Sequence, residues 1–256
     1  MPAELKNIVG DSPKVTKITG GLARAGAPVY SRIGYLLFSD IAAGKIMKWQ
    51  GGSLTVFRDN SNGANGLTFD HQGRLLAGEK GRVTRTEKDG KLTVLSHQNA
   101  TDVAYAIDGN IYCSGTAGVH RIHPKSGKAV ASRECERPAG VALGPNQQQL
   151  YVADAGQRNI RIFDIAANGG LQNGRVFADM KVGPPAGLKT DESGWVWVAG
   201  PGGIWVFNKE GNLLGTIAVP ESPSNLNWGE GFHNLFVTAQ TSIYRIEAKV
   251  NGTRTF

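Results

Sequence analysis

The sequence predicts an all-β protein, a six-bladed β-propeller of four-stranded blades that forms a single domain over residues 1–256. Three observations carry this prediction. Short apolar runs recur six times, glycine is abundant with 35 residues, and no long helical pattern interrupts the repeat. A repeat period near 40 residues, with several short strands in each unit, is typical of propellers.

The most regular element of each unit is the apolar run, which we interpret as the second strand of a blade. The six runs begin at Leu36, Leu75, Ile111, Leu150, Val196 and Leu235. Successive starts therefore lie 39, 36, 39, 46 and 39 residues apart. A first strand precedes each run across a turn such as the Asp-Gly-Asn at 108–110. A third strand follows, and a fourth is expected to complete the blade.

The last unit ends near Lys249, which leaves too few residues for a fourth strand. The segment 13–18 (Pro-Lys-Val-Thr-Lys-Ile) precedes the first unit and alternates in polarity as strands do. We therefore predict that residues 13–18 supply the outer strand of the last blade. Such a closure removes the open sheet edges that favour aggregation.

Composition and charge argue against several classes of function. The formal net charge is +7, but Lys and Arg form neither a cluster of four nor a stripe interleaved with aromatic residues, so no nucleic-acid partner is expected. The positive charge leaves room for a mild preference for anionic substrates. No stretch is long enough to span a bilayer and no signal peptide is evident, so we predict no membrane partner and a cytoplasmic location. With only Cys113 and Cys135, no thiolate metal motif is present.

Several segments resemble the senescence marker protein/gluconolactonase/luciferin-regenerating enzyme family. They are 34–41 (Gly-Tyr-Leu-Leu-Phe-Ser-Asp-Ile), 64–70 (Ala-Asn-Gly-Leu-Thr-Phe-Asp), 73–76 (Gly-Arg-Leu-Leu), 150–154 (Leu-Tyr-Val-Ala-Asp), 173–178 (Asn-Gly-Arg-Val-Phe-Ala) and 238–240 (Thr-Ala-Gln). The resemblance extends from about Ile18 to Ile246. It implies a six-bladed propeller related to lactone hydrolases, which hold one divalent cation on the central axis through a Glu, two Asn and an Asp.

The family's ligand positions all carry other residues in this chain. The Glu position corresponds to Gly26, the first Asn to Thr101, the second Asn to Ala139 and the Asp to Ala186. Gly and Ala have no ligand atoms in their side chains, whereas a hard divalent cation needs several oxygens, usually including a carboxylate. We therefore predict no metal ion and no cofactor at this site.

The equivalent position in every blade is small and uncharged. From the first blade to the sixth, these ring residues are Gly26, Asn65, Thr101, Ala139, Ala186 and Ser224. We expect them to line a substrate pocket that is wider and drier than a sugar-lactone site, and that takes a bulkier, more apolar small molecule. The alternative is that the site was lost without a replacement.

Carboxylates close to this ring are candidates for acid–base chemistry. Asp102 follows the third ring position directly and is predicted to be the principal acid/base. Glu79 is predicted to assist, and its neighbour Lys80 either keeps it ionised or attracts an anionic group. Asp40 and Asp154 end two second strands and are expected at the same mouth, although an Asp in such a place commonly binds turn amides.

Tyr30 and His97 complete the candidate set. Tyr30 stands where the family often has Trp and is predicted to offer a hydroxyl to the pocket. His97 lies in the loop that leads to the third blade, on the side expected to form the mouth, and is a candidate acid/base. Cys113 falls within a second strand and is predicted to be a buried, inert thiol.

The sequence thus favours a metal-independent enzyme that acts on a small, relatively apolar molecule in the central pocket. Its chemistry is lactone or ester hydrolysis, or an acid–base isomerisation, elimination or cyclisation. Strictosidine-synthase-like propellers offer a similar case, with a carboxylate in a metal-free, hydrophobic central pocket. Two alternatives remain: a non-catalytic propeller that binds a small molecule or a protein, and a metal-dependent lactonase whose ligands the sequence does not reveal.

Overall fold

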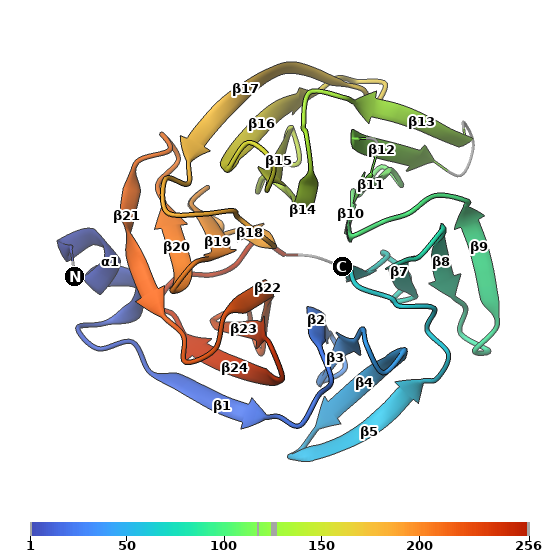
Figure 1. The fold of residues 1–256 in the computed structure, drawn as a ribbon, viewed down its shortest axis with the longest axis horizontal. Helices are drawn as coiled ribbons and strands as arrows, with labels where there is room; N and C mark the ends of the chain where they lie inside the picture. Colours follow the sequence, from blue (N-terminus) through green and yellow to red (C-terminus); the bar gives the residue numbers. More distant parts are fainter. Residues whose placement is uncertain (1, 117, 124–126, 255–256) are drawn as a thin grey trace.

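Six four-stranded antiparallel sheets surround a central axis in the computed structural model, which describes residues 2–116, 118–123 and 127–254 (Figure 1). The predicted all-β, six-bladed propeller is confirmed. Neighbouring inner strands pack around the axis in the order in which the blades follow one another along the chain.

Each blade runs from an inner strand at the axis to an outer strand at the rim. Blade 1 contains β2 (Ala25–Ser31), β3 (Tyr35–Asp40), β4 (Lys45–Gln50) and β5 (Ser53–Arg58). Blade 2 contains β6 (Leu67–Phe69), β7 (Leu75–Glu79), β8 (Arg82–Thr86) and β9 (Leu92–Ser96). Blade 3 contains β10 (Asp102–Tyr105), β11 (Ile111–Gly115), β12 (Gly118–His123) and β13 (Gly127–Ser132).

The second half of the ring repeats this plan. Blade 4 contains β14 (Pro138–Leu143), β15 (Gln149–Asp154), β16 (Asn159–Ile165) and β17 (Leu171–Asp179). Blade 5 contains β18 (Leu188–Thr190), β19 (Val196–Gly200), β20 (Gly203–Phe207) and β21 (Leu213–Ala218). Blade 6 contains β22 (Pro223–Gly229), β23 (Asn234–Ala239), β24 (Ser242–Glu247) and, from the N-terminal region, β1 (Val15–Thr19).

The predicted apolar runs form the second strands, which are the most deeply buried elements of the blades. Every residue of β7, β11 and β19 is buried, whereas nearly all of β5, at the rim, is exposed. Both faces of a second strand are covered by the two adjacent blades. Their sequences are therefore continuously apolar and do not alternate between apolar and polar residues.

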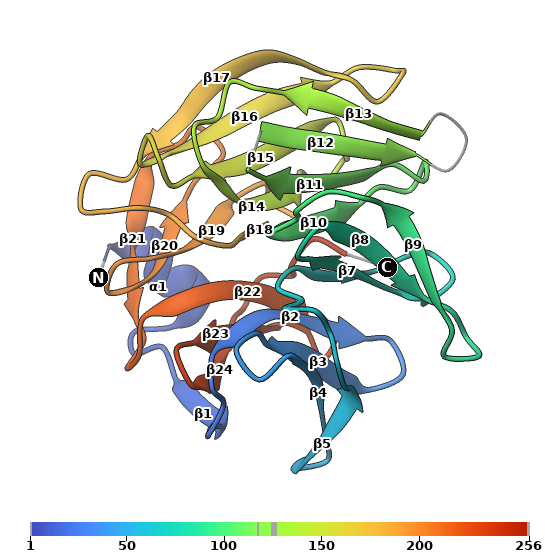
Figure 2. The same ribbon diagram turned by 45° about the vertical axis from the view of Figure 1, so that its right-hand side comes forward.

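The ring is closed by pairing between β1 and β24, which lie side by side at the rim (Figure 2). Val15 pairs with Ile246 and Thr16 with Arg245. The prediction that residues 13–18 complete the last blade is confirmed, with the strand itself spanning Val15–Thr19. Because its two partners come from opposite ends of the chain, this blade holds the ring shut.

The short helix α1 (Ala3–Val9) is an addition to the predicted fold. Leu5, Ile8 and Val9 are spaced so that they share one face of the helix, and all three are buried against the core of blades 5 and 6. The Ile8 carbonyl accepts a hydrogen bond from the Lys249 amide. Within the described residues, no helix has the length and apolarity that crossing a membrane would require.

Glu221, in the loop before β22, ties this closure together. Its carboxylate accepts hydrogen bonds from Lys17 of β1, from the amide of Thr241, and from the hydroxyls of Ser242 and Tyr244. Burial raises the pKa of Glu221, but these four hydrogen bonds outweigh it and lower the pKa to about 2. The ionised carboxylate is thus held by groups from both ends of the chain.

We predict that Glu221→Gln reduces the acid sensitivity of the fold. The folded-state pKa of Glu221 lies below its ordinary value of 4.5, so its stabilisation is complete above pH 4.5 and is lost as the pH falls towards 2. Urea unfolding at several pH values in this window should give a shallower pH dependence for Glu221→Gln than for the wild type. Glu247→Gln, which changes an exposed carboxylate of the same blade, is the control; equal slopes for both variants would contradict the prediction.

The chain after β24 runs to the axis and covers one end of the central channel (Figure 1). The amide of Gly252 donates to the Phe232 carbonyl, and the amide of Thr253 donates to the Thr190 carbonyl. Gly252 lies flat against Trp228, where a Cβ would be only 1.8 Å from the indole Cγ. This C-terminal tail therefore needs glycine at position 252.

We predict that Gly252→Ala lowers the free energy of unfolding by about 1–3 kcal/mol, the usual cost of overpacking a filled site. The added methyl group must displace either the tail or the Trp228 indole, which donates a hydrogen bond to Thr190. Chemical denaturation measures the loss. Gly144→Ala is the control, because a Cβ there meets its nearest neighbour at an ordinary 3.6 Å; equal losses in both variants would count against the prediction.

Candidate functional site

A cavity of about 310 Å³ lies at one end of the axis, where the inner strands of all six blades begin. It is lined by Arg24, Ala25, Ile41, Asn65, Thr101, Ala139, Ala186, Gly187, Ser222, Ser224, Asn225 and Gln240. Five of the six predicted ring residues are among them. The structure therefore brings the predicted ring together around one cavity, which we call the axial cavity.

The sixth ring residue, Gly26, is covered by a neighbour. A Cβ on Gly26 would lie 2.7 Å from Cδ1 of Ile41 and 2.9 Å from Oδ1 of Asn65. Ile41 belongs to the turn after β3 and fills the space that a larger side chain at position 26 would need. Next to Gly26, the wall of the cavity is therefore formed by the apolar side chain of Ile41.

Glycines beneath the ring let adjacent inner strands approach closely. A Cβ on Gly66 would lie 2.4 Å from Cα of Asp102, and a Cβ on Gly187 would lie 2.7 Å from Cα of Asn225. Neither site has room for a side chain. This approach brings Asp102 beside Asn225, which occupies the equivalent position in blade 6 and lines the floor of the axial cavity. Asp102 itself lies just behind that lining.

The Asp102 carboxyl is the buried acid at this floor, with only 1% of the residue exposed. It accepts hydrogen bonds from the amides of Val103 and Val141, at 3.0 and 3.2 Å, and one from the side chain of Asn225. Lys189 Nζ lies 3.9 Å from Oδ2. Burial raises the pKa of Asp102 above its ordinary value of 3.8, although Lys189 and the three hydrogen bonds act against the rise.

Lys189 places an ammonium group in the interior of the channel. Its side chain is 11% exposed, and Nζ donates to the Leu188 carbonyl at 2.9 Å. Lys189 also lines a second, much smaller cavity of about 30 Å³, which the C-terminal tail closes with Thr253. The Asp102–Lys189 pair thus separates the axial cavity from the covered end of the channel.

Two ring residues offer polar groups that are not engaged elsewhere. Among the described residues, neither the Asn65 side-chain amide nor the Thr101 hydroxyl forms a hydrogen bond with another residue. Ser224 differs, because its hydroxyl donates to the carbonyls of Ala25 and Thr238. Asn65 and Thr101 are therefore neutral donors that the ring presents to a ligand.

Comparison with known proteins identifies the family. A protein-family profile described as "SMP-30/Gluconolactonase/LRE-like region" matches residues 25–241, which is most of the chain. The chain belongs to this family. It is 25% identical over 302 residues to the gluconolactonase of Zymomonas mobilis, with 97% of this chain and 85% of the relative covered.

Solved structures share the propeller. A gluconolactonase from Xanthomonas campestris superposes with a TM-score of 0.88 at 24% identity, covering 97% of this chain and 93% of the other. Regucalcin from Agrobacterium tumefaciens, a calcium-binding protein, superposes with a TM-score of 0.82 at 16% identity, covering 96% of each chain. These likenesses establish the fold of this family member.

The axial residues of this family member do not fit a divalent cation. The four positions that correspond to the family's ligands carry Gly26, Thr101, Ala139 and Ala186, which together supply one neutral hydroxyl oxygen. Of the described residues that line the axial cavity, only Arg24 has an ionisable side chain, and it is itself a cation. Across the described residues, His, Cys, Asp and Glu form no group of three or more that could hold a metal ion.

Asp40 and Asp154 do not line the axial cavity. Each accepts hydrogen bonds from the two backbone amides that precede the inner strand of its own blade, and each also binds the turn that follows it. The prediction that they contact substrate is therefore corrected. They are buried turn-binding carboxylates that fix the backbone at the mouth.

Glu79 is also drawn away from the cavity. Both of its oxygens are engaged, one by Arg58 and the Thr84 hydroxyl and the other by Arg82, and the side chain is fully buried. Lys80 is exposed, and it packs its methylenes over Gly63. The structure therefore supports neither the assisting role of Glu79 nor a substrate contact by Lys80.

Tyr30 and His97 lie outside the axial cavity as well. Tyr30 is near the far end of β2 and stacks on Phe236 with ring centroids 5.4 Å apart. Burial and the charge of Glu230 raise the pKa of its hydroxyl. His97 is exposed in the loop between β9 and β10. Cys113, as predicted, is buried, and burial raises the pKa of its thiol to about 12.

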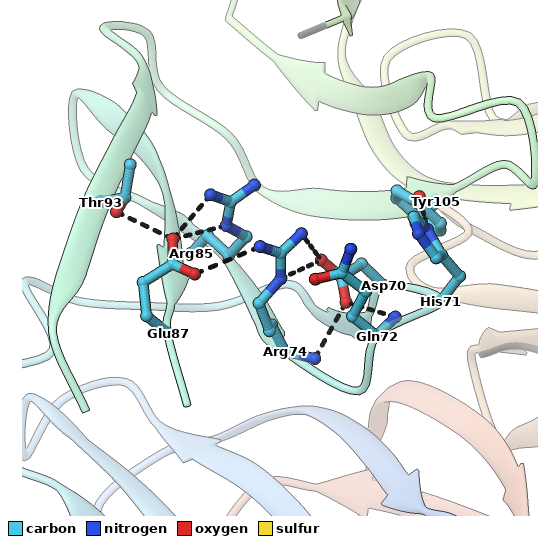
Figure 3. A network of polar contacts seen from close by, with 8 residues as sticks. All are labelled: Asp70, His71, Gln72, Arg74, Arg85, Glu87, Thr93 and Tyr105. Atoms are coloured by element: carbon cyan, nitrogen blue, oxygen red, sulfur yellow. Dashed lines mark hydrogen bonds and ion pairs between the residues drawn. The ribbon is translucent and has the colours of Figure 1, made fainter. Parts of the chain in front are cut away.

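A groove of about 470 Å³ on the opposite face, between blades 2 and 3, is a weaker candidate because its charges neutralise one another (Figure 3). Asp70 accepts from Nε of Arg74, and Arg74 also donates to Glu87. Arg85 forms a second ion pair with Glu87. These contacts fasten a hairpin and leave little net charge for a ligand.

Four residues of the site were outside the sequence prediction, namely Arg24, Ile41, Lys189 and Asn225. A signal existed for Asn225, which follows Ser224 as Asp102 follows Thr101. Lys189 lies on an inner strand next to the apolar Leu188, so it was detectable as a charge within a buried segment.

We predict that Lys189→Met lowers the free energy of unfolding at pH 7 by about 3–5 kcal/mol, because it leaves the Asp102 carboxylate buried without a counter-charge. Without Lys189, the pKa of Asp102 in the folded state rises further above 3.8, and the folded protein favours the protonated carboxyl. The free energy of unfolding therefore decreases as the pH increases above 3.8. The deficit should therefore be smaller at pH 4 than at pH 7. Urea unfolding of Lys189→Met and of the double variant Asp102→Asn/Lys189→Met tests this; a double variant no more stable than the single one would refute it.

Proposed function

We propose that this protein hydrolyses a lactone or ester bond in the axial cavity, without a divalent cation. The observation that carries the proposal is the placement of a buried carboxyl, Asp102, directly behind a cavity that presents neutral donors from its ring. Family membership and the gluconolactonase relatives support hydrolysis of this kind. The lack of fit between the axial residues and a cation supports a different means of polarising the carbonyl.

In the proposal, two neutral hydrogen-bond donors polarise the substrate carbonyl in place of a cation. The Asn65 amide and the Thr101 hydroxyl are free to donate to the carbonyl oxygen of a bound ester. Charge that develops on this oxygen during attack is stabilised by preorganised donors. Both groups line the cavity and come from adjacent blades, and in the proposal one carbonyl oxygen accepts from both.

Asp102 serves as the acid/base of the reaction. A water oxygen bonds to the carbonyl carbon, the carbon–oxygen bond to the leaving alcohol breaks, and the proton that water loses ends on that alcohol. Asp102 accepts this proton and returns it. Asn225, which lines the cavity, donates to the carboxyl, so substrate binding must let a water molecule pass Asn225 to reach Asp102.

The walls favour a substrate that is less polar than a sugar lactone. Ile41, Ala139 and Ala186 offer apolar contact around the ring. Burial of apolar surface contributes roughly 25 cal/mol for each Å² that leaves water. A lactone or ester with an alkyl portion matches this lining better than a polyol does.

We predict that Asp102→Asn lowers kcat by about 10²–10⁴-fold, the usual contribution of a general acid or base. The assay is hydrolysis of 4-nitrophenyl hexanoate and of alkyl-substituted lactones by protein treated with a chelator. Wild-type activity should survive the chelator, and it should fall with decreasing pH through a midpoint above 3.8, because burial raises the pKa of Asp102.

Asp59→Asn, which changes a carboxylate that is 61% exposed at the rim of blade 1, is the matched control and should retain full activity. Melting curves of both variants separate a loss of catalysis from a loss of fold. Undiminished turnover in Asp102→Asn would remove Asp102 from the mechanism. Activity that disappears with chelator and returns with Ca²⁺ or Mg²⁺ would overturn the metal-free proposal, and ester binding without turnover would indicate a binding protein.

A further inference from the structure

Arg24 gives the axial cavity a charge that none of the described residues balances. It is the one ionisable residue in the lining, and its guanidinium forms no hydrogen bond or ion pair with another of the described residues. The arginines of the groove between blades 2 and 3 behave differently, because Asp70 and Glu87 pair with them. An unpaired guanidinium at a cavity is a binding group for an anion.

The backbone of Arg24 is held in place by Asp40. The carboxylate accepts hydrogen bonds from the amides of Ala23 and Arg24, at 3.0 and 2.9 Å, and the Arg24 carbonyl accepts from the amide of Ile41. This residue therefore has a fixed backbone at the mouth, although its side chain is exposed. A fixed backbone reduces the conformational entropy that is lost when the side chain binds a ligand.

Blade 4 repeats this arrangement with Arg137. Asp154 accepts from the amides of Glu136 and Arg137, at 2.8 and 3.0 Å, and the Arg137 carbonyl accepts from the amide of Ala155. Each arginine stands two residues before the ring position of its own blade. The same hydrogen-bonding arrangement therefore places an arginine at the mouth in both blade 1 and blade 4.

Blades 1 and 4 are opposite one another in the six-membered ring, so the two arginines approach the mouth from opposite sides (Figure 1). Arg137 lines a groove of about 520 Å³ that adjoins the axial cavity through their shared residue Thr101. Arg137 is partly satisfied, since it donates to the Ala155 carbonyl and has Glu136 beside it in the groove. Arg24 is therefore the stronger anion site of the two.

We propose that the substrate is an anionic lactone or ester whose carboxylate is bound by Arg24, with Arg137 contributing from across the mouth. This inference rests on the proposed hydrolysis and names its substrate class. A guanidinium presents two parallel N–H donors that match both oxygens of a carboxylate. The net charge of +7 on the whole chain attracts such a substrate at long range.

The test compares two esters of equal acyl length, 4-nitrophenyl hydrogen adipate, which carries a carboxylate at its far end, and the neutral 4-nitrophenyl hexanoate. We expect the wild type to favour the adipate ester by about tenfold in kcat/KM, mainly through KM, as for one charged hydrogen bond. Added salt should reduce this preference. Arg24→Gln should bring the ratio of the two kcat/KM values close to one, and Arg137→Gln should lower it less.

Two further variants sharpen the test. Arg24→Lys keeps the charge but loses the paired donors, so it should retain part of the preference. Arg158→Gln is the matched control, because Arg158 is exposed, lies in the turn after Asp154 and lines neither the axial cavity nor the adjoining groove. It makes the same change in net charge and should keep the wild-type ratio.

The inference and the proposed function can fail separately. A wild-type ratio near one, or a preference that survives replacement of both Arg24 and Arg137, overturns the inference while hydrolysis stands. If neither ester is turned over, the proposed function fails, and calorimetric titration with adipate decides the inference. Adipate binding that Arg24→Gln abolishes supports it, whereas no binding or unchanged binding overturns it.

Discussion

A single buried carboxylate, that of Asp102, holds half of the propeller together at its axis. It belongs to blade 3 and binds the amide of Val141 in blade 4, the ammonium of Lys189 in blade 5 and the side chain of Asn225 in blade 6. A buried ion in this position is tolerable because three hydrogen bonds and a nearby ammonium group compensate its loss of hydration. The glycines that let the inner strands approach make these contacts possible. The floor of the axial cavity, where Asn225 lies, therefore depends on the Asp102 carboxylate as well.

The distribution of charge along the axis follows from this constraint. Lys189 and Asp102 neutralise one another in the interior, and within the described part of the chain no group of three or more His, Cys, Asp and Glu residues could hold a metal ion. The positive charge lies instead at the mouth, on the exposed side chains of Arg24 and Arg137, which are accessible to water and to ligands. A site of this kind selects its ligand by charge at the rim, and stabilises a developing oxyanion by neutral donors further in.

The sequence predicted the fold closely because a repeat fixes many positions at once. Continuous apolar runs marked the second strands, and the missing last strand revealed the closure by residues 13–18. The ring was also accessible, since equivalent positions in equivalent blades must surround one axis. The helix α1 was missed because it rests on three residues, Leu5, Ile8 and Val9, too few to form a pattern.

The roles of single side chains were much harder to predict. Glu79 ends its strand at the correct face, but Arg58 from blade 1 and Arg82 from the next strand capture it. No local pattern shows such partners from other strands. Tyr30 is four residues after Gly26 on an extended strand, roughly 13 Å further along the axis. Distance along the strand therefore excluded it from the mouth, although its sequence context resembled that of a pocket residue.

The C-terminal tail affects how ligands enter and leave the axial cavity. In the part of the chain that the structure describes, the tail covers the far end of the channel against Trp228 and Thr190, so the axial cavity opens at its mouth. Whatever enters must leave by the same route, so departure of one molecule and arrival of the next are strictly sequential. In such a cavity, the residence time of the bound ligand sets the rate at which one ligand replaces another. The arginines at the mouth therefore affect the release of a product as much as the binding of a substrate.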